Sequence, residues 1–278
     1  MNKGYIKFWG VRGSNPTPDT NKIKYGGDTS CVEIKTALND TIILDMGTGI
    51  RNLGDKIISD LSYSKEINIF LSHYHWDHIM GFFYFKPLYD PKYTINIYGY
   101  NKKTSISQVS EILTNKNFWP VDKELYKANI NFIEMPESSD QEKSIDINKT
   151  KIYYSLHPHP NGTNSLKIDT GNKKIVYVTD CEHPEGSLNP NVVAIAKECD
   201  ILIHDSHFSI NDLSQYKGWG HSSWKQAVDV AITSDVKQLI LFHHSPDYDD
   251  NQVELNEKNA QKKFVNTIAS YQGLSIDF

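Results

Sequence analysis

The sequence predicts an α/β fold in which helices cover the faces of β-sheets, because short apolar runs alternate with amphipathic segments along most of the chain. The apolar runs are rich in β-branched residues, as buried strands are. We expect strands at residues 5–8, 31–34, 41–44, 67–71, 95–98, 152–156, 175–179, 201–203 and 239–242. Apolar residues three or four positions apart predict helices at residues 50–61, 105–113, 223–233 and 254–271.

The length favours one domain. A chain of 278 residues can bury a large core without disulfide bonds, and it shows neither an internal repeat nor a low-complexity linker. We therefore predict a single domain over residues 1–278. The polar segment at residues 134–148 is interpreted as a solvated loop and not as a domain boundary.

The number and spacing of the cysteines indicate the cellular compartment, and the net charge indicates which binding partners to expect. Cys31, Cys181 and Cys199 are odd in number and widely spaced, which indicates buried small residues in a reducing, cytoplasmic compartment. Lys and Arg total 29 against 34 for Asp and Glu, a net charge of −5 that disfavours binding of long nucleic acids by charge alone. A small anionic substrate held by a metal ion is compatible with this balance. The chain shows no signal segment at its start and no run of about 20 apolar residues, so we expect no membrane partner.

Polar residues follow several of the predicted strands at the point where each strand ends. They are Asp45, His73, Asp180, His204 with Asp205, and His243. If the strands share a sheet, their carboxyl ends form one rim, and ligands of α/β sheets bind at such rims. The rim is therefore where we expect the chemistry.

A histidine-rich motif gives the strongest signal for a metal site. The segment His73-Tyr74-His75-Trp76-Asp77-His78 places four ligand-type side chains within six residues, directly after an apolar run. Imidazole and carboxylate groups are ligands that zinc accepts, and a solvated histidine patch is a poor alternative for so dense a group. One motif of this kind can serve two adjacent metal ions.

This motif, H-x-H-x-D-H, resembles the signature of the metallo-β-lactamase superfamily, and later motifs match in order across nearly the whole chain. The resemblance implies a four-layer αββα sandwich and two divalent metal ions, zinc first, with manganese or iron as alternatives. It also implies that a hydroxide shared by the two ions is the nucleophile. The ligands it implies are His73, His75 and His159 for one metal, Asp77, His78 and His243 for the second, and Asp180 as the bridge. Asp77 also counts among the catalytic residues, and Asp45 is expected to brace the site without binding metal.

Neighbouring histidines leave two of these assignments open. His157 competes with His159, and the spacing to the next strand favours His159. His244 competes with His243, which comes first after its strand and is preferred. His183 and His207 are interpreted as surface residues or as residues that support the site.

Two further segments resemble the phosphodiesterase branch of the superfamily, which includes tRNase Z and cyclic nucleotide phosphodiesterases. Gly218-Trp219-Gly220-His221-Ser222-Ser223 resembles the Gly-His-Ser-Thr segment whose histidine contacts phosphate, and 204–208 resembles the segment whose acid orients that histidine. By this resemblance His221 protonates the leaving oxygen and Asp205 orients it. Ser222, and Arg12 in the N-terminal motif at 8–14, are predicted to bind the substrate, with a structural ion pair as the alternative for Arg12.

The resulting prediction is a metal-dependent phosphoric diester hydrolase that acts on a small cyclic phosphodiester, a 3′,5′-cyclic nucleotide first. The N-terminal segments at 8–14 and 25–31 resemble those of hydrolases similar to class II cyclic AMP phosphodiesterases. Three alternatives stay open: an RNA 3′-processing enzyme similar to tRNase Z, a phosphoribosyl 1,2-cyclic phosphate phosphodiesterase, and, from another class, a lactamase or thioesterase. Relatives in this branch also suggest a homodimer.

Overall fold

The computed structural model describes residues 3–137 and 144–278, which form two compact units, each built on one mixed β-sheet. The first unit comprises residues 3–10, 28–137 and 272–278, and the second residues 11–27 and 144–271. The prediction of one domain over the whole chain stays a prediction. Part of the predicted loop at 134–148, residues 138–143, lies outside the described residues, and the loop prediction was too long because residues 145–147 form a strand.

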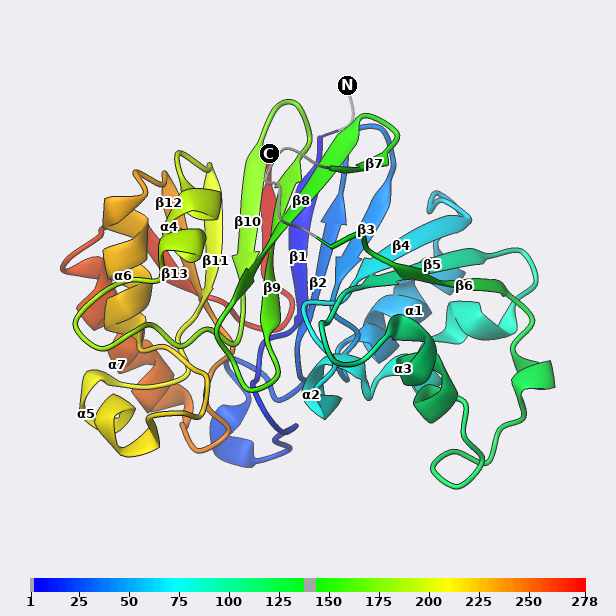
Figure 1. Ribbon diagram of the computed structural model, residues 1–278, viewed down its shortest axis with the longest axis horizontal. Helices are drawn as coiled ribbons and strands as arrows, with labels where there is room; N and C mark the ends of the chain where they lie inside the picture. The colour runs from blue at the N-terminus through cyan, green and yellow to red at the C-terminus, as the bar shows by residue number, and fades with distance from the viewer. Residues whose placement is uncertain (1–2, 138–143) are drawn as a thin grey trace. The chain divides into compact units, whose positions relative to one another are not determined.

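The described strands of the first unit form a sheet in the order β14-β1-β2-β3-β4-β5-β6 (Figure 1). The strands are β1 (Tyr5–Gly10), β2 (Cys31–Lys35), β3 (Thr41–Leu44), β4 (Glu66–Phe70), β5 (Thr94–Gly99), β6 (Asn129–Glu134) and β14 (Ser275–Asp277). Strands β3 to β6 run parallel, so their carboxyl ends share one edge, whereas β1 pairs antiparallel with β2 and β14.

Helices cover this sheet with apolar side chains. They are α1 (Ile50–Ser59), α2 (Trp76–Ile79) and α3 (Ile106–Leu113), with 3-10 helices at Phe82–Tyr84, Lys86–Tyr89 and Lys123–Leu125. Helix α1 buries Leu53 and Ile57 in the same core as Ile69 of β4 and Ile97 of β5. Burial of such aliphatic side chains is the main stabilising term of the unit.

A ladder of asparagine side chains links three parallel strands of this unit. Asn68, Asn96 and Asn131 are directly opposite one another in β4, β5 and β6. Asn96 Nδ2 donates to Asn68 Oδ1 (3.0 Å), and Asn131 Nδ2 donates to Asn96 Oδ1 (2.9 Å). The sequence analysis did not predict β6, although its alternation of asparagine with apolar residues is like that of β5. Each amide of the ladder finds a partner directly across the strands.

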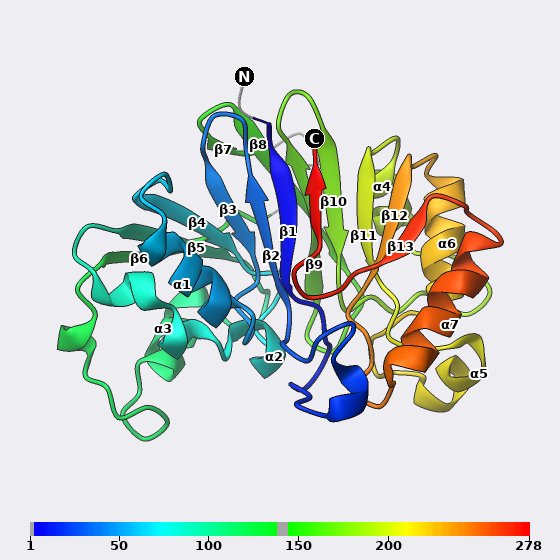
Figure 2. The ribbon, with the colours of Figure 1, turned by 180° about the vertical axis from the view of Figure 1, so that it is seen from behind.

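The described strands of the second unit form a sheet in the order β13-β12-β11-β10-β9-β8-β7 (Figure 2). They are β7 (Ile145–Ile147), β8 (Thr150–His157), β9 (Thr163–Asp169), β10 (Lys174–Val178), β11 (Ile201–Asp205), β12 (Gln238–Phe242) and β13 (Thr267–Ala269). Strands β10 to β13 are parallel, and β7 to β10 are antiparallel.

The helices of the second unit pack their apolar sides into one core with this sheet. They are α4 (Pro190–Ala196), α5 (Ile210–Leu213), α6 (Trp224–Thr233) and α7 (Asp250–Gln261), with 3-10 helices at Thr20–Lys22 and Ser214–Tyr216. The helix predicted at 254–271 was wrong in its second half. It ends at Gln261, and Ile268 instead pairs with Ile240 in the parallel ladder of β13 and β12. The four-residue spacing of Ala260, Phe264 and Ile268 therefore spans a helix and a strand.

Two predictions about the whole chain can be compared with these units. Cys31, Cys181 and Cys199 are all buried and free, as predicted. Within the part of the chain that the structure describes, no helix combines the length and the apolarity that crossing a bilayer requires.

The asparagine ladder leads to a stability prediction. Asn96→Ala removes the middle amide and with it the hydrogen bonds to Asn68 and Asn131. Urea unfolding should show a loss of about 1–3 kcal/mol, the cost of leaving the buried amide of Asn68 unsatisfied. The control replaces all three asparagines by Val. Because no unpaired amide is then left in the ladder, this variant should be more stable than Asn96→Ala, and equal stability of the two would contradict the role of the ladder.

Candidate metal and catalytic site

The polar residues at strand ends belong to two sheets. The single rim that one shared sheet would give is therefore not present among the described strands. Asp45 and His73 follow β3 and β4 of the first unit, whereas Asp180, Asp205 and His243 lie at the ends of β10, β11 and β12 of the second. Each set lies where parallel strands end, so each unit has a rim of polar residues at the carboxyl ends of its strands. Asp45 (φ 60°), Asp180 (φ 50°) and His243 (φ 60°) have left-handed backbones, a strain that clusters at functional sites.

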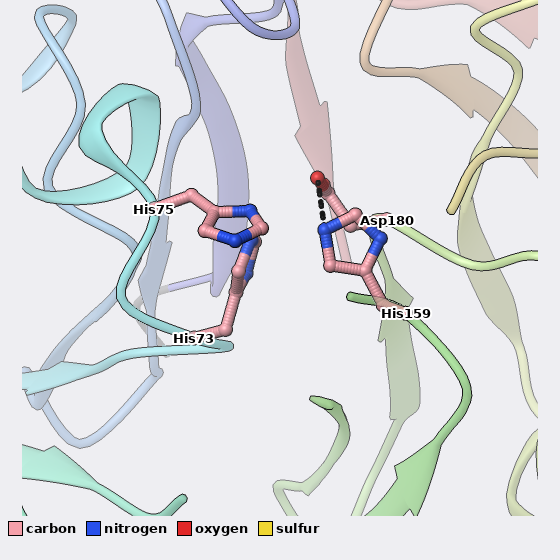
Figure 3. A group of neighbouring side chains, drawn as sticks. All are labelled: His73, His75, His159 and Asp180. Carbon is pink, nitrogen blue, oxygen red and sulfur yellow. Dashed lines mark ion pairs between the residues drawn. The ribbon is translucent and has the colours of Figure 1, made fainter. Parts of the chain in front are cut away.

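In the first unit, the histidine motif bends from the end of β4 into the short helix α2. His75 occupies the N-cap position, and Asp77 and His78 fall in the first helical turn. The ring of His73 is 4.5 Å from that of His75 and 4.3 Å from that of His78, measured between centroids. Figure 3 labels His73 and His75 on this segment. The structure therefore gathers the motif into one cluster.

Asp45 orients this cluster, as expected of a residue that braces the site. Its Oδ1 accepts from the backbone N of Ser72 (2.7 Å), and its Oδ2 accepts from Ser72 Oγ (2.9 Å). The same Oδ2 lies 2.8 Å from His78 Nδ1. A carboxylate can only accept, so the proton of the neutral His78 ring stays on Nδ1 and Nε2 carries none.

Two ligand-type atoms in this cluster have the spacing of ligands on one ion. His78 Nε2 lies 3.1 Å from Asp77 Oδ2, and both side chains are buried. Two ligands about 2.0–2.1 Å from one tetrahedral zinc ion stand about 3.3 Å apart. The spacing of these two atoms thus fits two ligands of one cation.

In the second unit, Asp180 directs its two carboxylate oxygens toward different histidines. Oδ2 lies 3.5 Å from His159 Nε2, the pair joined by a dashed line in Figure 3, and Oδ1 lies 3.1 Å from His243 Nε2. His159 Nδ1 donates to the carbonyl of Gly220 (2.8 Å), so its neutral ring carries no proton on Nε2. A carboxylate shared between two imidazoles in this way has the form of a bridging ligand.

His157 and His244, the sequence neighbours of the two proposed ligands, are buried and hydrogen-bonded to other protein groups. Both ring nitrogens of His157 are engaged, Nδ1 with Ser165 Oγ (2.9 Å) and Nε2 with the carbonyls of Thr179 (3.1 Å) and Asp180 (3.2 Å). Burial lowers the pKa of His157 to about 4. His244 Nε2 donates to the Ser270 carbonyl (2.9 Å), and burial lowers its pKa to about 3. These contacts favour His159 and His243 over their neighbours.

The contact between His221 and Asp205 that the sequence predicts is present. His221 Nδ1 donates to Asp205 Oδ2 (2.9 Å), and both side chains are buried. Asp205 Oδ1 accepts from the backbone N of His207 (2.8 Å). Burial alone would raise the pKa of the Asp205 carboxyl, but the charge and the hydrogen bond of His221 outweigh it and lower the pKa to about 2. Asp205 is therefore ionised and stabilises a protonated His221.

His207 and His183 are buried and do not lie at the surface. The ring of His207 stacks on His221 at a centroid distance of 4.2 Å, and its Nδ1 is 3.1 Å from the His243 carbonyl. Burial lowers the pKa of His183 to about 3, and its Nδ1 accepts from the backbone N of Asn189 (3.0 Å).

The two residues predicted to bind substrate, Arg12 and Ser222, are both buried and bonded to the backbone, and their contact with substrate stays a prediction. Arg12 is fully buried, its Nε donates to the Gly26 carbonyl (2.8 Å), and its Nη1 donates to the carbonyls of Ser245 (3.0 Å) and Tyr248 (2.9 Å). The hydroxyl of Ser222 is also buried and donates to the Cys181 carbonyl. Both side chains hold loops together, since Nε and Nη1 of Arg12 and the hydroxyl of Ser222 donate to backbone carbonyls.

The N-terminal glycine motif supports His243 through the backbone. A Cβ atom on Gly13 would lie 2.5 Å from His243 Nδ1, and the Gly13 backbone N donates to the His244 carbonyl (3.0 Å). Only a glycine lets the chain pass this close to the ring. Gly13 therefore accommodates a histidine of the site.

Glu182 is a site residue that the sequence analysis missed. It lines two cavities of about 370 and 380 Å³, of which the first is also lined by His221 and the second by His159. An acidic residue in a loop gives no periodic signal. The only available hint was its position two residues after Asp180.

Comparison with known proteins agrees with this geometry. The model of the β-lactamase superfamily domain matches residues 41–244. Ribonuclease Z of Picrophilus torridus is 27% identical over 296 residues, covering 91% of this chain and 89% of that protein. Ribonuclease Z of Archaeoglobus fulgidus is 37% identical over 109 residues, which cover only 38% of this chain and 32% of that protein.

Solved structures show the same fold. The metallo-β-lactamase fold protein YhfI from Bacillus subtilis has a TM-score of 0.74 at 16% identity, with both chains fully covered. The short form of human tRNase Z has a TM-score of 0.67 at 18% identity, with 98% of each chain covered. These matches confirm the predicted metallo-β-lactamase fold. The chain therefore belongs to the β-lactamase superfamily, in its branch of metal-dependent hydrolases similar to phosphodiesterases and ribonuclease Z.

Proposed function

We propose that the protein is a phosphodiesterase that uses two divalent metal ions. The observation that carries the proposal is Asp180, whose two oxygens lie 3.5 Å from His159 and 3.1 Å from His243, next to the hydrogen-bonded pair of His221 and Asp205. A bridging carboxylate indicates two metals. An acid paired with a histidine beside them suits protonation of an alkoxide leaving group.

The residues proposed to hold the ions are those of the superfamily pattern. His73, His75 and His159 would bind one ion, Asp77, His78 and His243 the other, and Asp180 both. The ligand set is made of imidazole and carboxylate groups, which zinc, manganese and iron all accept. The chemistry supplied at such a site, when it is loaded, is Lewis-acid polarisation of phosphoryl oxygens and a lowered pKa of water.

His221 supplies the proton in this proposal. Its Nδ1 proton is held by Asp205, so Nε2 is the ring atom that can donate to a leaving oxygen. The ionised carboxylate of Asp205 stabilises the imidazolium form, which keeps the acid protonated before transfer. Asp205 thus acts through His221 and needs no contact with the substrate.

Two substrate classes follow from different observations. A small cyclic phosphodiester, with 3′,5′-cyclic nucleotides first, follows from the N-terminal motifs and the net charge of −5. RNA 3′-end processing is favoured by the ribonuclease Z relative that matches 91% of this chain. Because of that relative, RNA is retained as a substrate class although the charge balance disfavoured nucleic acid.

A pair of adjacent variants tests the metal ligands. His159→Ala should lower the metal content measured by elemental analysis, because it removes a proposed ligand. His157→Ala should keep the metal and lower the unfolding temperature, since its nitrogens bond only to protein groups. Full metal content in His159→Ala, together with a loss in His157→Ala, would reverse the assignment.

A second pair tests the acid. His221→Ala should reduce kcat for bis(p-nitrophenyl) phosphate by roughly 10²-fold or more, the usual contribution of a general acid, without loss of metal. Asp205→Asn should reduce kcat less and shift the alkaline limb of its pH profile to lower pH, because the imidazolium loses its counter-charge. Wild-type kcat in His221→Ala would contradict its role.

Substrate class is tested with a panel of a cyclic nucleotide, a cyclic phosphoribose, a tRNA precursor and nitrocefin, assayed on metal-quantified protein. Hydrolysis of a phosphodiester supports the proposal. Turnover of nitrocefin alone would replace the proposal with a lactamase function.

A further inference from the structure

The carboxylate of Glu182 binds the backbone of the loop at 218–220. Glu182 Oε1 accepts from the backbone N of Gly218 (2.8 Å), and its Oε2 accepts from the backbone N of Gly220 (2.7 Å). Hydrogen bonds from backbone N–H groups to an ionised carboxylate are about twice as strong as those between neutral groups. Both oxygens of Glu182 are thus used to fix one short loop.

The same loop contacts a proposed metal ligand. The carbonyl of Gly220 accepts the Nδ1 proton of His159 (2.8 Å), so Gly220 is bound at its N–H by Glu182 and at its C=O by His159. A Cβ on Gly220 would lie 2.0 Å from His159 Nδ1, and its φ of +85° also favours glycine. The backbone here lies directly against the imidazole ring.

The next residue of the loop is the proposed acid. His221 follows Gly220 and binds Asp205 through Nδ1 (2.9 Å). A displacement of Gly220 therefore changes the acceptor of His159 on one side and the position of the His221 ring on the other. The hydrogen bonds of Glu182 to the backbone of this loop act on both rings through Gly220.

From these contacts we propose that Glu182 is a positioning residue that couples the metal ligand His159 to the acid His221. The inference rests on the proposed function. By holding Gly220, Glu182 keeps the proton of His159 on Nδ1, which leaves Nε2 available for a metal, and at the same time fixes the site of proton donation. Groups that orient the ligands of a metal in this way contribute 10- to 100-fold to metal affinity.

The chain offers a matched control for the charge change. Glu185 lies three residues further along the same segment, and its carboxylate pairs with Lys217 (2.7 Å) in an exposed ion pair. Glu185→Gln removes the same charge as Glu182→Gln but leaves the loop at 218–220 bound. A simple electrostatic effect on the site would appear in both variants, whereas a positioning effect would appear only in Glu182→Gln.

The experiment measures metal affinity by competition with a chelator, and kcat and KM for bis(p-nitrophenyl) phosphate, in the full chain. We expect Glu182→Gln to bind one zinc ion about 10-fold or more weakly and, when saturated with metal, to lose kcat by about 10-fold with KM little changed. Glu182→Asp should recover part of both, since it keeps the charge. Glu185→Gln should match the wild type.

An NMR readout separates this proposal from the proposed function. In ¹⁵N-labelled metal-free protein, the His159 Nδ1 proton should exchange faster with solvent in Glu182→Gln than in Glu185→Gln. Unchanged exchange and unchanged zinc affinity in a folded Glu182→Gln variant would overturn the positioning role. If the wild type binds no metal and cleaves no phosphodiester while the two variants still differ in exchange, the proposed function is overturned. The role of Glu182 in holding the loop would then stand.

Discussion

The chemistry of this protein depends on where the histidine protons are placed. A neutral imidazole has one N–H and one lone pair and can serve as a metal ligand only if the lone pair lies on the correct nitrogen, whereas an imidazolium acts as an acid through the N–H that is not held by the protein. Here, protein oxygens hold the Nδ1 protons of three histidines. Asp45 binds His78, the Gly220 carbonyl binds His159, and Asp205 binds His221. Because all three acceptors are fixed by strands or by other hydrogen bonds, the tautomers are set by the fold.

Strand ends and loops provide these acceptors in different ways. Asp45 and Asp205 lie where parallel strands end, so the sheets position them directly. Gly220 lies in a loop, where no sheet fixes the backbone. The carboxylate of Glu182 fixes it instead, by accepting from the Gly220 backbone N. The strained backbones of Asp180 and His243 fit the same picture, because the surrounding ladders hold these residues in conformations that an isolated chain would avoid.

The parts that could be predicted from the sequence are those that depend on neighbouring residues. The histidine motif is a cluster because its members lie within a span of six residues, and the superfamily resemblance supplied the pairing of His221 with Asp205. Arg12 and Ser222 were assigned to the substrate because a motif shows which residue is present but not whether backbone carbonyls already surround it. β6 was missed although asparagine alternates with its apolar residues as it does in the predicted strand β5.

The asparagine ladder affects the register in which the parallel strands of the first sheet pair. Moving β5 by two residues relative to β4 would preserve the alternation of inward and outward side chains, so burial of apolar groups discriminates weakly against that slip. The amides add discrimination, because the slip in one direction places Asn96 opposite Phe70, which can neither donate nor accept, and the slip in the other direction places Asn68 opposite the large ring of Tyr98. The hydrogen bond between Asn96 and Asn68 thus favours the observed alignment of β4 and β5.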